Sequence, residues 1–267
     1  MIVYPDIDPI ALRLGPVKVH WYGIMYLIGF ATAWLLGRWR AARPGSTWKP
    51  VDVDDLVFFG MVGGILGGRI GYVLIYGLTF WTAQNPWYPI EIWDGGMSIH
   101  GGLIGALVAL AIFAHRRGRS FADVLDFTAP LPAPGLFFGR MGNFINGELW
   151  GKPTTLPWGF LYHGQVRQPS QLYEGFLEGI VLFTVMWWFT AKSRPRLAPS
   201  GLFLVLYGTF RFLVEFVRLP DPQVGYLAWG WLTMGQLLSL PMILIGGALL
   251  TYAYSARLRS GNFAAAQ

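Results

Sequence analysis

Apolar residues are gathered in long runs along the chain, and short segments rich in glycine, proline and charge separate them. A helix needs about 20 apolar residues to cross the hydrocarbon core of a bilayer. The pattern predicts seven membrane-spanning helices, at about residues 19–37, 56–76, 97–114, 121–141, 171–191, 200–218 and 232–255. Pro130, Pro132 and Pro134 must break or kink the fourth. We therefore expect an all-α, polytopic integral membrane protein.

Basic residues are distributed unequally between the segments that join these runs. The segments after the first, third, fifth and last runs hold 4, 3, 3 and 2 Lys or Arg residues, whereas the loop at 77–96 holds none. Cytoplasmic loops are enriched in Lys and Arg, so a periplasmic N-terminus and a cytoplasmic C-terminus are predicted. The opposite loops carry tryptophans, as an interfacial aromatic belt does: Trp81, Trp87, Trp93, Trp150, Trp158, Trp229 and Trp231.

Composition supports the membrane interpretation. Only 13% of the residues are charged and the mean hydropathy is +0.45, whereas soluble domains carry about 25% charged residues. The net charge of +6 comes from clusters between apolar runs rather than from a stripe, so we expect no nucleic-acid binding. The absence of cysteine excludes disulfides, thiolate metal sites and a cysteine nucleophile in this chain.

The organisation of the chain is expected to be simple. Residues 1–9 contain two Asp and no Lys or Arg, so they lack the basic region of a signal peptide, and the first run is expected to be retained. We expect one membrane-embedded domain over residues 1–267, with a short periplasmic element at about 142–170. The sequence offers no obvious metal-binding cluster, so no metal site is expected.

Glycines recur at spacings of three and four in the second run, at Gly60, Gly63, Gly64, Gly67, Gly68 and Gly71. Small residues at these spacings let two membrane helices pack closely, which is the main interpretation. Arg69 lies inside the same run. An arginine at that depth needs a partner or a water-filled cavity.

Two polar motifs flanked by glycines are the strongest candidates for a site. His100 opens His-Gly-Gly at the outer end of the third run. It is either a hydrogen-bonded interfacial residue or a general base. Arg140, Asn143, Asn146 and Glu148 follow the proline-rich run among four glycines. They form either a polar loop or a cradle for an anionic phosphate, held by the arginine fork and backbone N–H groups.

A third polar group lies on the sixth run. Tyr207, Arg211, Glu215 and Arg218 are spaced 4, 4 and 3 apart, so they share one face of a helix. An ion pair between Arg211 and Glu215 that only fixes helix packing explains part of this pattern. It does not explain why the same face carries two arginines. Three acidic residues are candidate counter-ions for Arg69, Arg140 or Arg211, and the sequence leaves the pairs open: Asp126, Glu174 and Glu178.

The predicted topology brings several of these groups to one depth. Tyr22 stands at the outer mouth of the first run, in His-Trp-Tyr-Gly. Tyr22, His100, residues 140–148 and Arg218 all reach the outer half of the membrane in this topology. Ionisable groups are costly there, so their convergence indicates a site between spans.

The same stretches resemble the family of bacterial prolipoprotein diacylglyceryl transferases over about residues 5–255. The most specific is Gly-Arg-Met-Gly-Asn-Phe-Ile-Asn-Gly-Glu at 139–148. Others are His-Trp-Tyr-Gly-Ile-Met-Tyr at 20–26, Gly-Gly-Arg-Ile-Gly-Tyr at 67–72, Ile-His-Gly-Gly-Leu-Ile-Gly at 99–105, Pro-Ser-Gln-Leu-Tyr-Glu at 169–174 and Tyr-Gly-Thr-Phe-Arg-Phe-Leu-Val-Glu-Phe-Val-Arg at 207–218. Gln168 departs from the His that family members often carry before Pro-Ser-Gln, which argues against a catalytic role there.

The resemblance implies a multi-pass enzyme of the bacterial inner membrane, monomeric, with its active site toward the periplasm. It would transfer the sn-1,2-diacylglyceryl group of phosphatidylglycerol to the lipobox cysteine thiol of a prolipoprotein signal peptide. The products would be a thioether and sn-glycerol 1-phosphate, in the first step of lipoprotein maturation. Its partners would be these two substrates and the bilayer, and it would need no cofactor.

The roles implied by the resemblance suit the residue types. A thiol must lose its proton to become a good nucleophile, and His100, with Tyr22 as a helper, is the candidate base, although a tyrosine stays open as the base. Arg140 and Arg211 are the candidates to stabilise the leaving phosphate. Further residues are expected to bind or orient phosphatidylglycerol: Asn143, Asn146, Glu148, Gly151, Tyr207, Glu215 and Arg69. Of these, Glu148 and Glu215 are expected to act by positioning the arginines.

Three other function classes fit less well. A secondary transporter would carry an inverted repeat and polar residues in both leaflets. Another lipid head-group enzyme would show an acidic metal motif or a nucleophile of its own. A membrane scaffold would not need glycine-flanked charges at one depth. The sequence shows no such repeat, motif or nucleophile by inspection.

Overall fold

The structure, a computed structural model, describes residues 2–15, 17–81, 85–91, 95–220 and 224–264. Trp93, one of the predicted belt tryptophans, lies outside these ranges. The chain forms two compact units. The first unit combines residues 1–33 with 126–267, and the second unit is residues 34–125. The expected single domain over residues 1–267 stays a prediction.

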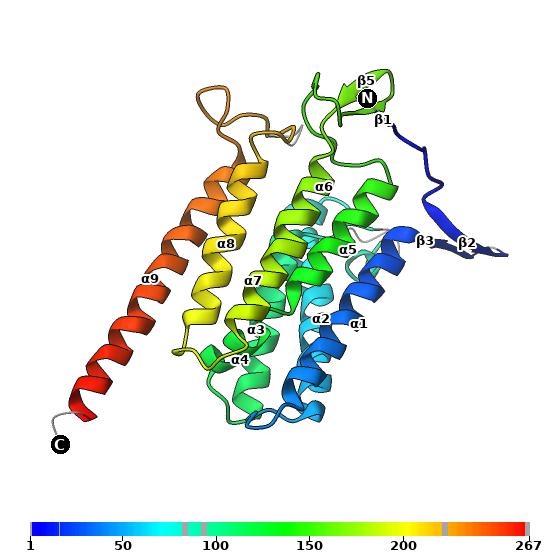
Figure 1. The fold of residues 1–267 in the computed structure, drawn as a ribbon. Coiled ribbons are helices and arrows are strands. Elements are labelled where there is room, and N and C mark those ends of the chain that lie inside the picture. Colours follow the sequence, from blue (N-terminus) through cyan, green and yellow to red (C-terminus); the bar gives the residue numbers. More distant parts are fainter. Residues whose placement is uncertain (1, 16, 82–84, 92–94, 221–223, 265–267) are drawn as a thin grey trace. The chain divides into compact units, whose positions relative to one another are not determined.

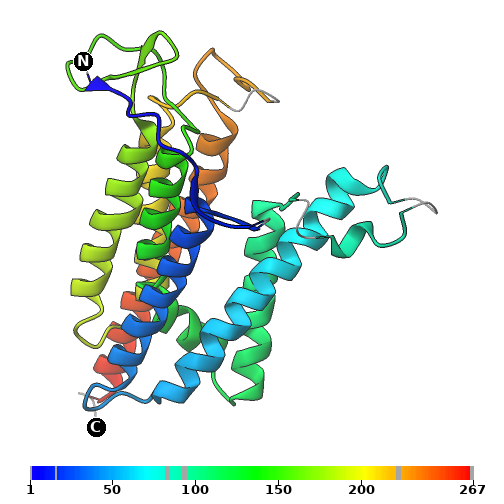
Figure 2. The ribbon, with the colours of Figure 1, turned by 90° about the vertical axis from the view of Figure 1, so that its right-hand side faces the viewer.

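In the second unit two helices pack along their lengths. Helix α2 (Pro50–Tyr72), extended by the π-helical turn η1 (Val73–Gly77), lies against α3 (Ile99–Arg116) (Figure 2). A Cβ on Gly67 would lie 2.4 Å from the carbonyl oxygen of Gly101, and one on Gly105 would lie 2.2 Å from that of Gly63. Because only glycine permits this approach, the predicted close packing of the glycine-rich run is confirmed.

The rest of the second unit consists of short pieces. They are the last turns of α1 (Trp21–Ala41), the 3-10 helix η2 (Tyr88–Ile90) and the start of α4 (Phe121–Thr128).

The first unit is a group of helices whose limits lie close to the predicted apolar runs (Figure 1). Helix α5 (Pro132–Ile145) begins after α4 ends, so the prolines divide the fourth run as expected. One continuous helical segment comprises α6 (Ser170–Glu174), the π-helix η4 (Gly175–Val181) and α7 (Leu182–Phe189). Helix α8 (Ala198–Val214) packs against α9 (Met234–Ala264). The sixth run was predicted to be helical to residue 218, but α8 ends four residues earlier.

Short strands complete the first unit, which the all-α prediction missed. Strands β1 (Ile2–Val3), β4 (Phe160–Tyr162) and β5 (Gln165–Arg167) form a sheet in the order β1-β4-β5, with β1 parallel to β4 and β4 antiparallel to β5. Strands β2 (Ile10–Leu14) and β3 (Val17–His20) form an antiparallel hairpin. Strands this short carry too few residues for a period-two pattern to be visible.

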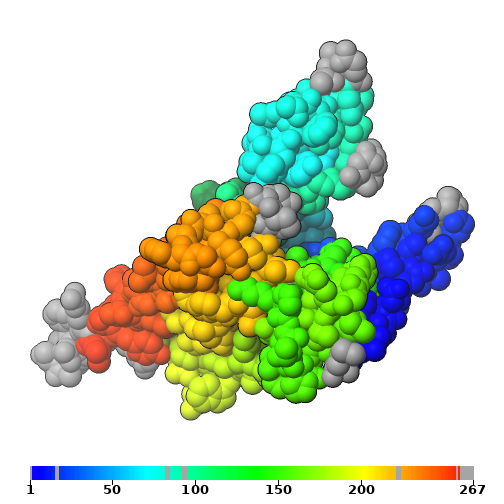
Figure 3. All heavy atoms as spheres, turned by 90° about the horizontal axis from the view of Figure 1, so that it is seen from above, coloured from blue at the N-terminus to red at the C-terminus, as the bar shows by residue number. Residues whose placement is uncertain are grey.

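An aromatic cluster attaches the N-terminal segment to residues 142–170. The Tyr4 hydroxyl donates to the carbonyl oxygens of Phe144, at 2.7 Å, and Ile145, at 2.9 Å. Its ring packs edge-on against Phe144, Trp150 and Tyr162. Burial, and next the neighbouring Tyr162, raise the pKa of the Tyr4 phenol. Residues 142–170 and the described residues between α8 and α9, 215–220 and 224–233, lie at the same end of the first unit (Figures 1 and 3).

Four helical segments are long and apolar enough to cross a membrane: Pro50–Gly77, Ile99–Arg116, Ser170–Phe189 and Met234–Ala256. Ala198–Val214 is apolar but shorter. The protein is therefore mostly helical, with apolar helices of the kind found in multi-pass membrane proteins. Seven spans and the orientation of the ends stay predictions.

Candidate active site

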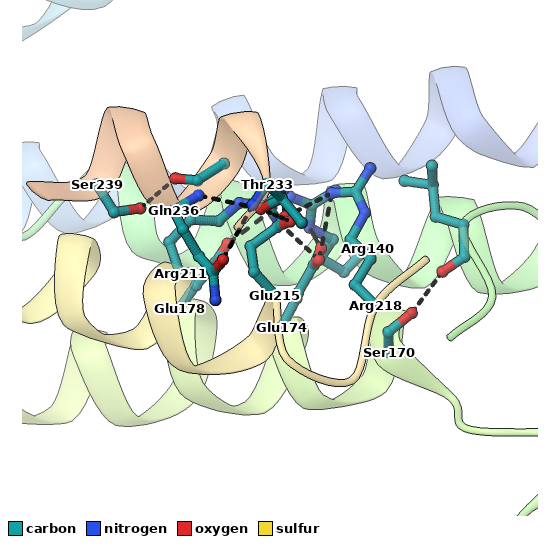
Figure 4. Close-up of polar contacts among 12 residues, drawn as sticks. Arg140, Ser170, Glu174, Glu178, Arg211, Glu215, Arg218, Thr233, Gln236 and Ser239 are labelled. Carbon is teal, nitrogen blue, oxygen red and sulfur yellow. Dashed lines mark hydrogen bonds and ion pairs between the residues drawn. The ribbon is translucent and has the colours of Figure 1, made fainter. Parts of the chain in front are cut away.

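The centre of the candidate site is the carboxylate of Glu174, the last residue of α6, which is fully buried. Arg140 from α5 reaches it with Nε at 2.5 Å, and Arg211 from α8 reaches it with Nη1 at 2.6 Å (Figure 4). A buried carboxylate needs such partners. Of the counter-ions that the sequence left open, Glu174 is thus the one that joins two of the arginines.

Further ion pairs surround this centre. Arg211 also pairs with Glu215 through Nη2, as the spacing of four predicted. Arg218 lies past the end of α8, with Nη1 3.5 Å from Glu174 and 3.8 Å from Glu215. Glu178, one turn after Glu174, lies 3.7 Å from Nη2 of Arg140. We refer to Arg140, Arg211, Arg218, Glu174, Glu178 and Glu215 as the ion cluster.

The ion cluster is not equally accessible in all its parts. Its three arginine side chains are 10–19% exposed, whereas its three glutamate side chains are at most 4% exposed. Three positive and three negative formal charges balance. The glutamate side chains are therefore the more deeply buried members of the ion cluster, and the arginine side chains are the more exposed ones, as the binding of an anionic group requires.

Asp126 is not a counter-ion of these arginines, contrary to one of the alternatives. Its carboxylate accepts hydrogen bonds from the backbone N–H of Leu197 at 2.6 Å and of Ser200 at 3.0 Å, and from the Ser200 hydroxyl at 2.5 Å. These are the free donors at the start of α8, so Asp126 caps that helix.

The glycine-flanked loop after α5 continues the polar network. Nη1 of Arg140 donates to Oδ1 of Asn143 at 3.4 Å, and Nδ2 of Asn143 donates to Oε2 of Glu148 at 3.1 Å. Asn146 donates to the other oxygen of Glu148 at 3.2 Å. Gly147 permits the turn between them with a φ of 68°. The structure thus brings together the four polar residues of this motif.

Two other predicted site residues, Tyr22 and Gly151, lie where a glycine allows a close contact. A Cβ on Gly142 would lie 2.8 Å from Cδ2 of Tyr22, so the tyrosine ring lies directly on α5, one residue from the Arg140–Asn143 pair. The Tyr22 hydroxyl lies 3.2 Å from that of Tyr26. The backbone of Gly151 forms an antiparallel β-bridge with that of Arg218. A Cβ on Gly151 would lie 2.6 Å from the carbonyl oxygen of Val217.

Tyr207 lies four residues before Arg211 on α8. Its ring stacks on that of Phe203, with 5.9 Å between the ring centroids, and packs against the apolar core formed by α5, α7 and α8. The role of Tyr207 in substrate binding stays a prediction.

Gln168 lies in a backbone ladder rather than in the ion cluster. Its carbonyl oxygen accepts from the N–H of Gly151 at 2.8 Å and its N–H donates to Lys152 at 3.0 Å. A main-chain role tolerates a change of side chain, which suits the departure at this position from the family pattern.

Arg69, in the second unit, finds its partner in the backbone. Its guanidinium donates to the carbonyl oxygens of Pro89 at 3.0 Å, Gly95 at 2.6 Å and Gly96 at 3.2 Å, and also to that of Tyr88. The arginine is 4% exposed. These contacts explain a buried arginine in the glycine-rich run, and its role in substrate binding stays a prediction.

His100 lies in the first turn of α3, and its side chain is exposed. The hydroxyl of Ser98, the N-cap of this helix, accepts from the N–H of Gly101 at 3.2 Å. His100 belongs to the second unit and the ion cluster to the first. Its role as a base stays a prediction.

Two residues that the sequence analysis missed adjoin the ion cluster. Thr233 donates a hydrogen bond to Oε2 of Glu215 at 2.6 Å, and Gln236, which is fully buried, is hydrogen-bonded to Thr233. The sequence Thr-Met-Gly-Gln at 233–236, at the start of the last apolar run, has the form of a capping box, and this signal could have identified them. Among the described residues, no group of three His, Asp or Glu side chains is placed to hold a metal ion.

Comparison with known proteins gives consistent matches over nearly the whole chain. The family model for prolipoprotein diacylglyceryl transferase matches residues 9–252. A phosphatidylglycerol–prolipoprotein diacylglyceryl transferase from Nitratidesulfovibrio vulgaris (strain Miyazaki F) is 58% identical over 253 residues, covering 94% of this chain and 95% of the relative. One of the same name from Coxiella burnetii is 56% identical over 257 residues, covering 95% of this chain and 98% of the relative.

Proposed function

Because this chain belongs to the prolipoprotein diacylglyceryl transferase family, we propose that it transfers the diacylglyceryl group of phosphatidylglycerol to the lipobox cysteine thiol of a prolipoprotein. The bond that breaks joins the glycerol carbon of the diacylglyceryl group to its phosphate oxygen. The bond that forms joins this carbon to the cysteine sulfur. The product is a thioether, and sn-glycerol 1-phosphate leaves with the electron pair of the broken bond.

One observation supports this assignment above the others: the arginine side chains of the ion cluster are 10–19% exposed, whereas its glutamate side chains are at most 4% exposed. The leaving phosphate gains negative charge as the C–O bond breaks. Fixed positive groups beside the developing charge lower the barrier, since they need no reorganisation during the reaction. In this mechanism Arg140 and Arg211 bind the phosphate, while Glu174 and Glu215 hold the two guanidinium groups in place.

The glycine-flanked loop orients the head group in the same mechanism. Asn143 and Asn146 offer amide donors and acceptors to the phosphate or the terminal glycerol, and Glu148 fixes both amides. Gly151 keeps the backbone close to Arg218. Tyr207 lines the same side of α8 as Arg211.

The thiol proton needs an acceptor, because the thiolate is the nucleophile. His100 is the base in this proposal, and Tyr22, whose ring packs against Gly142 of α5, assists it. The proton goes from the cysteine sulfur to the imidazole. Arg69 serves the reaction by holding the backbone shortly before His100, in addition to the lipid contact expected from the sequence.

The cellular setting follows from the same proposal. The chain is a monomer that crosses the bacterial inner membrane seven times, with a periplasmic N-terminus, a cytoplasmic C-terminus and the short element at 142–170 on the periplasmic side. Exported prolipoproteins present their cysteine on that side, where the site would meet both substrates.

The decisive experiment incubates purified protein with phosphatidylglycerol and a lipobox peptide and measures the peptide mass. A mass increase equal to one diacylglyceryl group is expected, with release of glycerol phosphate. No mass shift with folded protein would defeat the proposal.

Matched variants test the roles. His100→Gln and Arg140→Ala should each abolish transfer, whereas His115→Gln on the same helix and Arg13→Ala should not. His115 is exposed, and Arg13 forms an exposed ion pair with Asp8. Transfer by His100→Gln at the wild-type rate would remove the histidine as base.

A further inference from the structure

The N-terminus of α9 is closed by a capping box that also holds a carboxylate from another segment. The N–H of Thr233 donates to Oε1 of Gln236 at 3.0 Å, and the N–H of Gln236 donates to Oγ1 of Thr233 at 3.2 Å. This reciprocal pair leaves the hydroxyl proton of Thr233 free to donate to Oε2 of Glu215 at 2.6 Å (Figure 4). The cap of α9 therefore fixes a residue of the ion cluster.

Gly235 shapes the place where this carboxylate lies. A Cβ at this position would stand 2.5 Å from Cδ and 2.6 Å from Oε1 of Glu215. The carboxylate therefore packs directly against the first turn of α9. That turn has no acidic residue of its own, and negative charge is stabilised at a helix N-terminus. Glu215 supplies this charge from the end of α8.

The identity of Gln236 fits the same function. Capping boxes accept either Glu or Gln at this position. A glutamate at 236 would place a second negative charge beside Glu215, since both residues bond to Thr233. Glutamine keeps the acceptor oxygen without adding that charge. Thr233, Gln236 and Glu215 are at most 3% exposed, so repulsion between two carboxylates there would be poorly screened.

We propose that Thr233, Gly235 and Gln236 are positioning residues for Arg211. The cap fixes Glu215, Glu215 holds Nη2 of Arg211, and Glu174 holds Nη1 from the other side. The guanidinium is thereby aimed by two carboxylates, one of which depends on α9. The proposal rests on the phosphate-binding role of Arg211 in the proposed function.

Kinetics test whether the cap controls Arg211. Thr233→Val keeps the shape but removes the hydroxyl, and Gln236→Glu keeps the capping acceptor but adds charge. Each should lower kcat about 10–100-fold, the effect of displacing a catalytic group by about 1 Å, with the KM for the lipobox peptide unchanged. Thr233→Ser, which keeps the hydroxyl, should transfer lipid within about twofold of the wild-type rate. Ser239→Ala should leave it unchanged, because that hydroxyl, one turn on, donates only to the carbonyl of Gly235.

A thermal double-mutant cycle tests the same contact without relying on transfer. Gln236→Glu should lower the unfolding temperature in the wild-type background but not in Glu215→Gln, where the second carboxylate is absent. Equal effects in both backgrounds, or a fully active Gln236→Glu, would overturn the proposal. If the coupling is present while the wild-type protein transfers no lipid, the proposed function fails and the contact between the cap and Glu215 stands.

Discussion

Replacing Glu174 by glutamine tests the ion cluster at its centre. Glutamine has nearly the same shape but no charge, so three arginines would face two remaining glutamates and the balanced cluster would become positive. Glu174 is fully buried and lies 2.5 Å from Arg140 and 2.6 Å from Arg211. Removing one partner from a buried ion pair costs about 3–5 kcal/mol. Since 1 kcal/mol shifts the Tm of a domain of this size by about 2–4 °C, the Tm should fall by roughly 6–20 °C.

Glu178→Gln is the matched control for this change. Glu178 lies one turn away and is equally buried, but within the described part of the chain neither of its carboxylate oxygens accepts a hydrogen bond, and its pair with Arg140 is 3.7 Å long. Its replacement should cost less than half as much as that of Glu174, because less favourable interaction is lost.

Both variants can be followed in detergent by the fluorescence of the 13 tryptophans during heating. Lipid transfer should be measured below the lower of the two transitions, where Glu174→Gln should have lost most of its activity. A Tm for Glu174→Gln within about 2 °C of wild type, or a larger loss for Glu178→Gln, would refute the reasoning, since either result would mean that less than about 1 kcal/mol rests on Glu174.

Three further changes probe the supporting structure. Arg69→Lys should expose the loop around residue 88 to chymotrypsin, because an ammonium cannot span the carbonyls that the guanidinium fork joins; an unchanged cleavage rate would contradict this role. Gly105→Ala should cost about 1–3 kcal/mol in thermal unfolding because its Cβ meets a backbone oxygen at 2.2 Å, whereas Gly60→Ala, with nothing within 4 Å, should be neutral or stabilising. Tyr4→Phe should lower the free energy of unfolding by about 1–3 kcal/mol, because two carbonyl oxygens lose their hydrogen-bond donor. Because burial raises the pKa of Tyr4 above its unfolded value, the contribution of Tyr4 is complete below about pH 10 and is lost as the pH rises further. The free energy of unfolding, measured with a chemical denaturant, should therefore decline less steeply above that pH for Tyr4→Phe than for the wild type.

Several features of this protein could be predicted from local sequence. Long apolar runs dictate helices because no other regular structure satisfies the backbone of a single segment in lipid. Pro132 sets the start of α5, because a proline is tolerated in the first turn of a helix but not within it. Glycines at spacings of three and four in α2 predicted a close helix contact, because the small face of a helix is determined by its own sequence, and the structure shows that the partner is α3. The Arg211–Glu215 pair follows equally from a spacing of four on one helix.

The choice among distant partners required the tertiary structure. Asp126 and Glu174 were equivalent counter-ions in the sequence, yet Asp126 caps α8 whereas Glu174 joins two arginines. The difference depends on which helix ends pack together, and the local pattern around a carboxylate contains no information about that. The same holds for Tyr4, whose hydroxyl meets a carbonyl 140 residues away, and for the short strands that join the N-terminus to residues 160–162. The sequence by itself thus predicted the apolar helices and the candidate residues of a phosphate site. Packing alone decided that Glu174 contacts Arg140 and Arg211 and that the α9 cap contacts Glu215, since such contacts depend on distances across elements and not on periodicity within one.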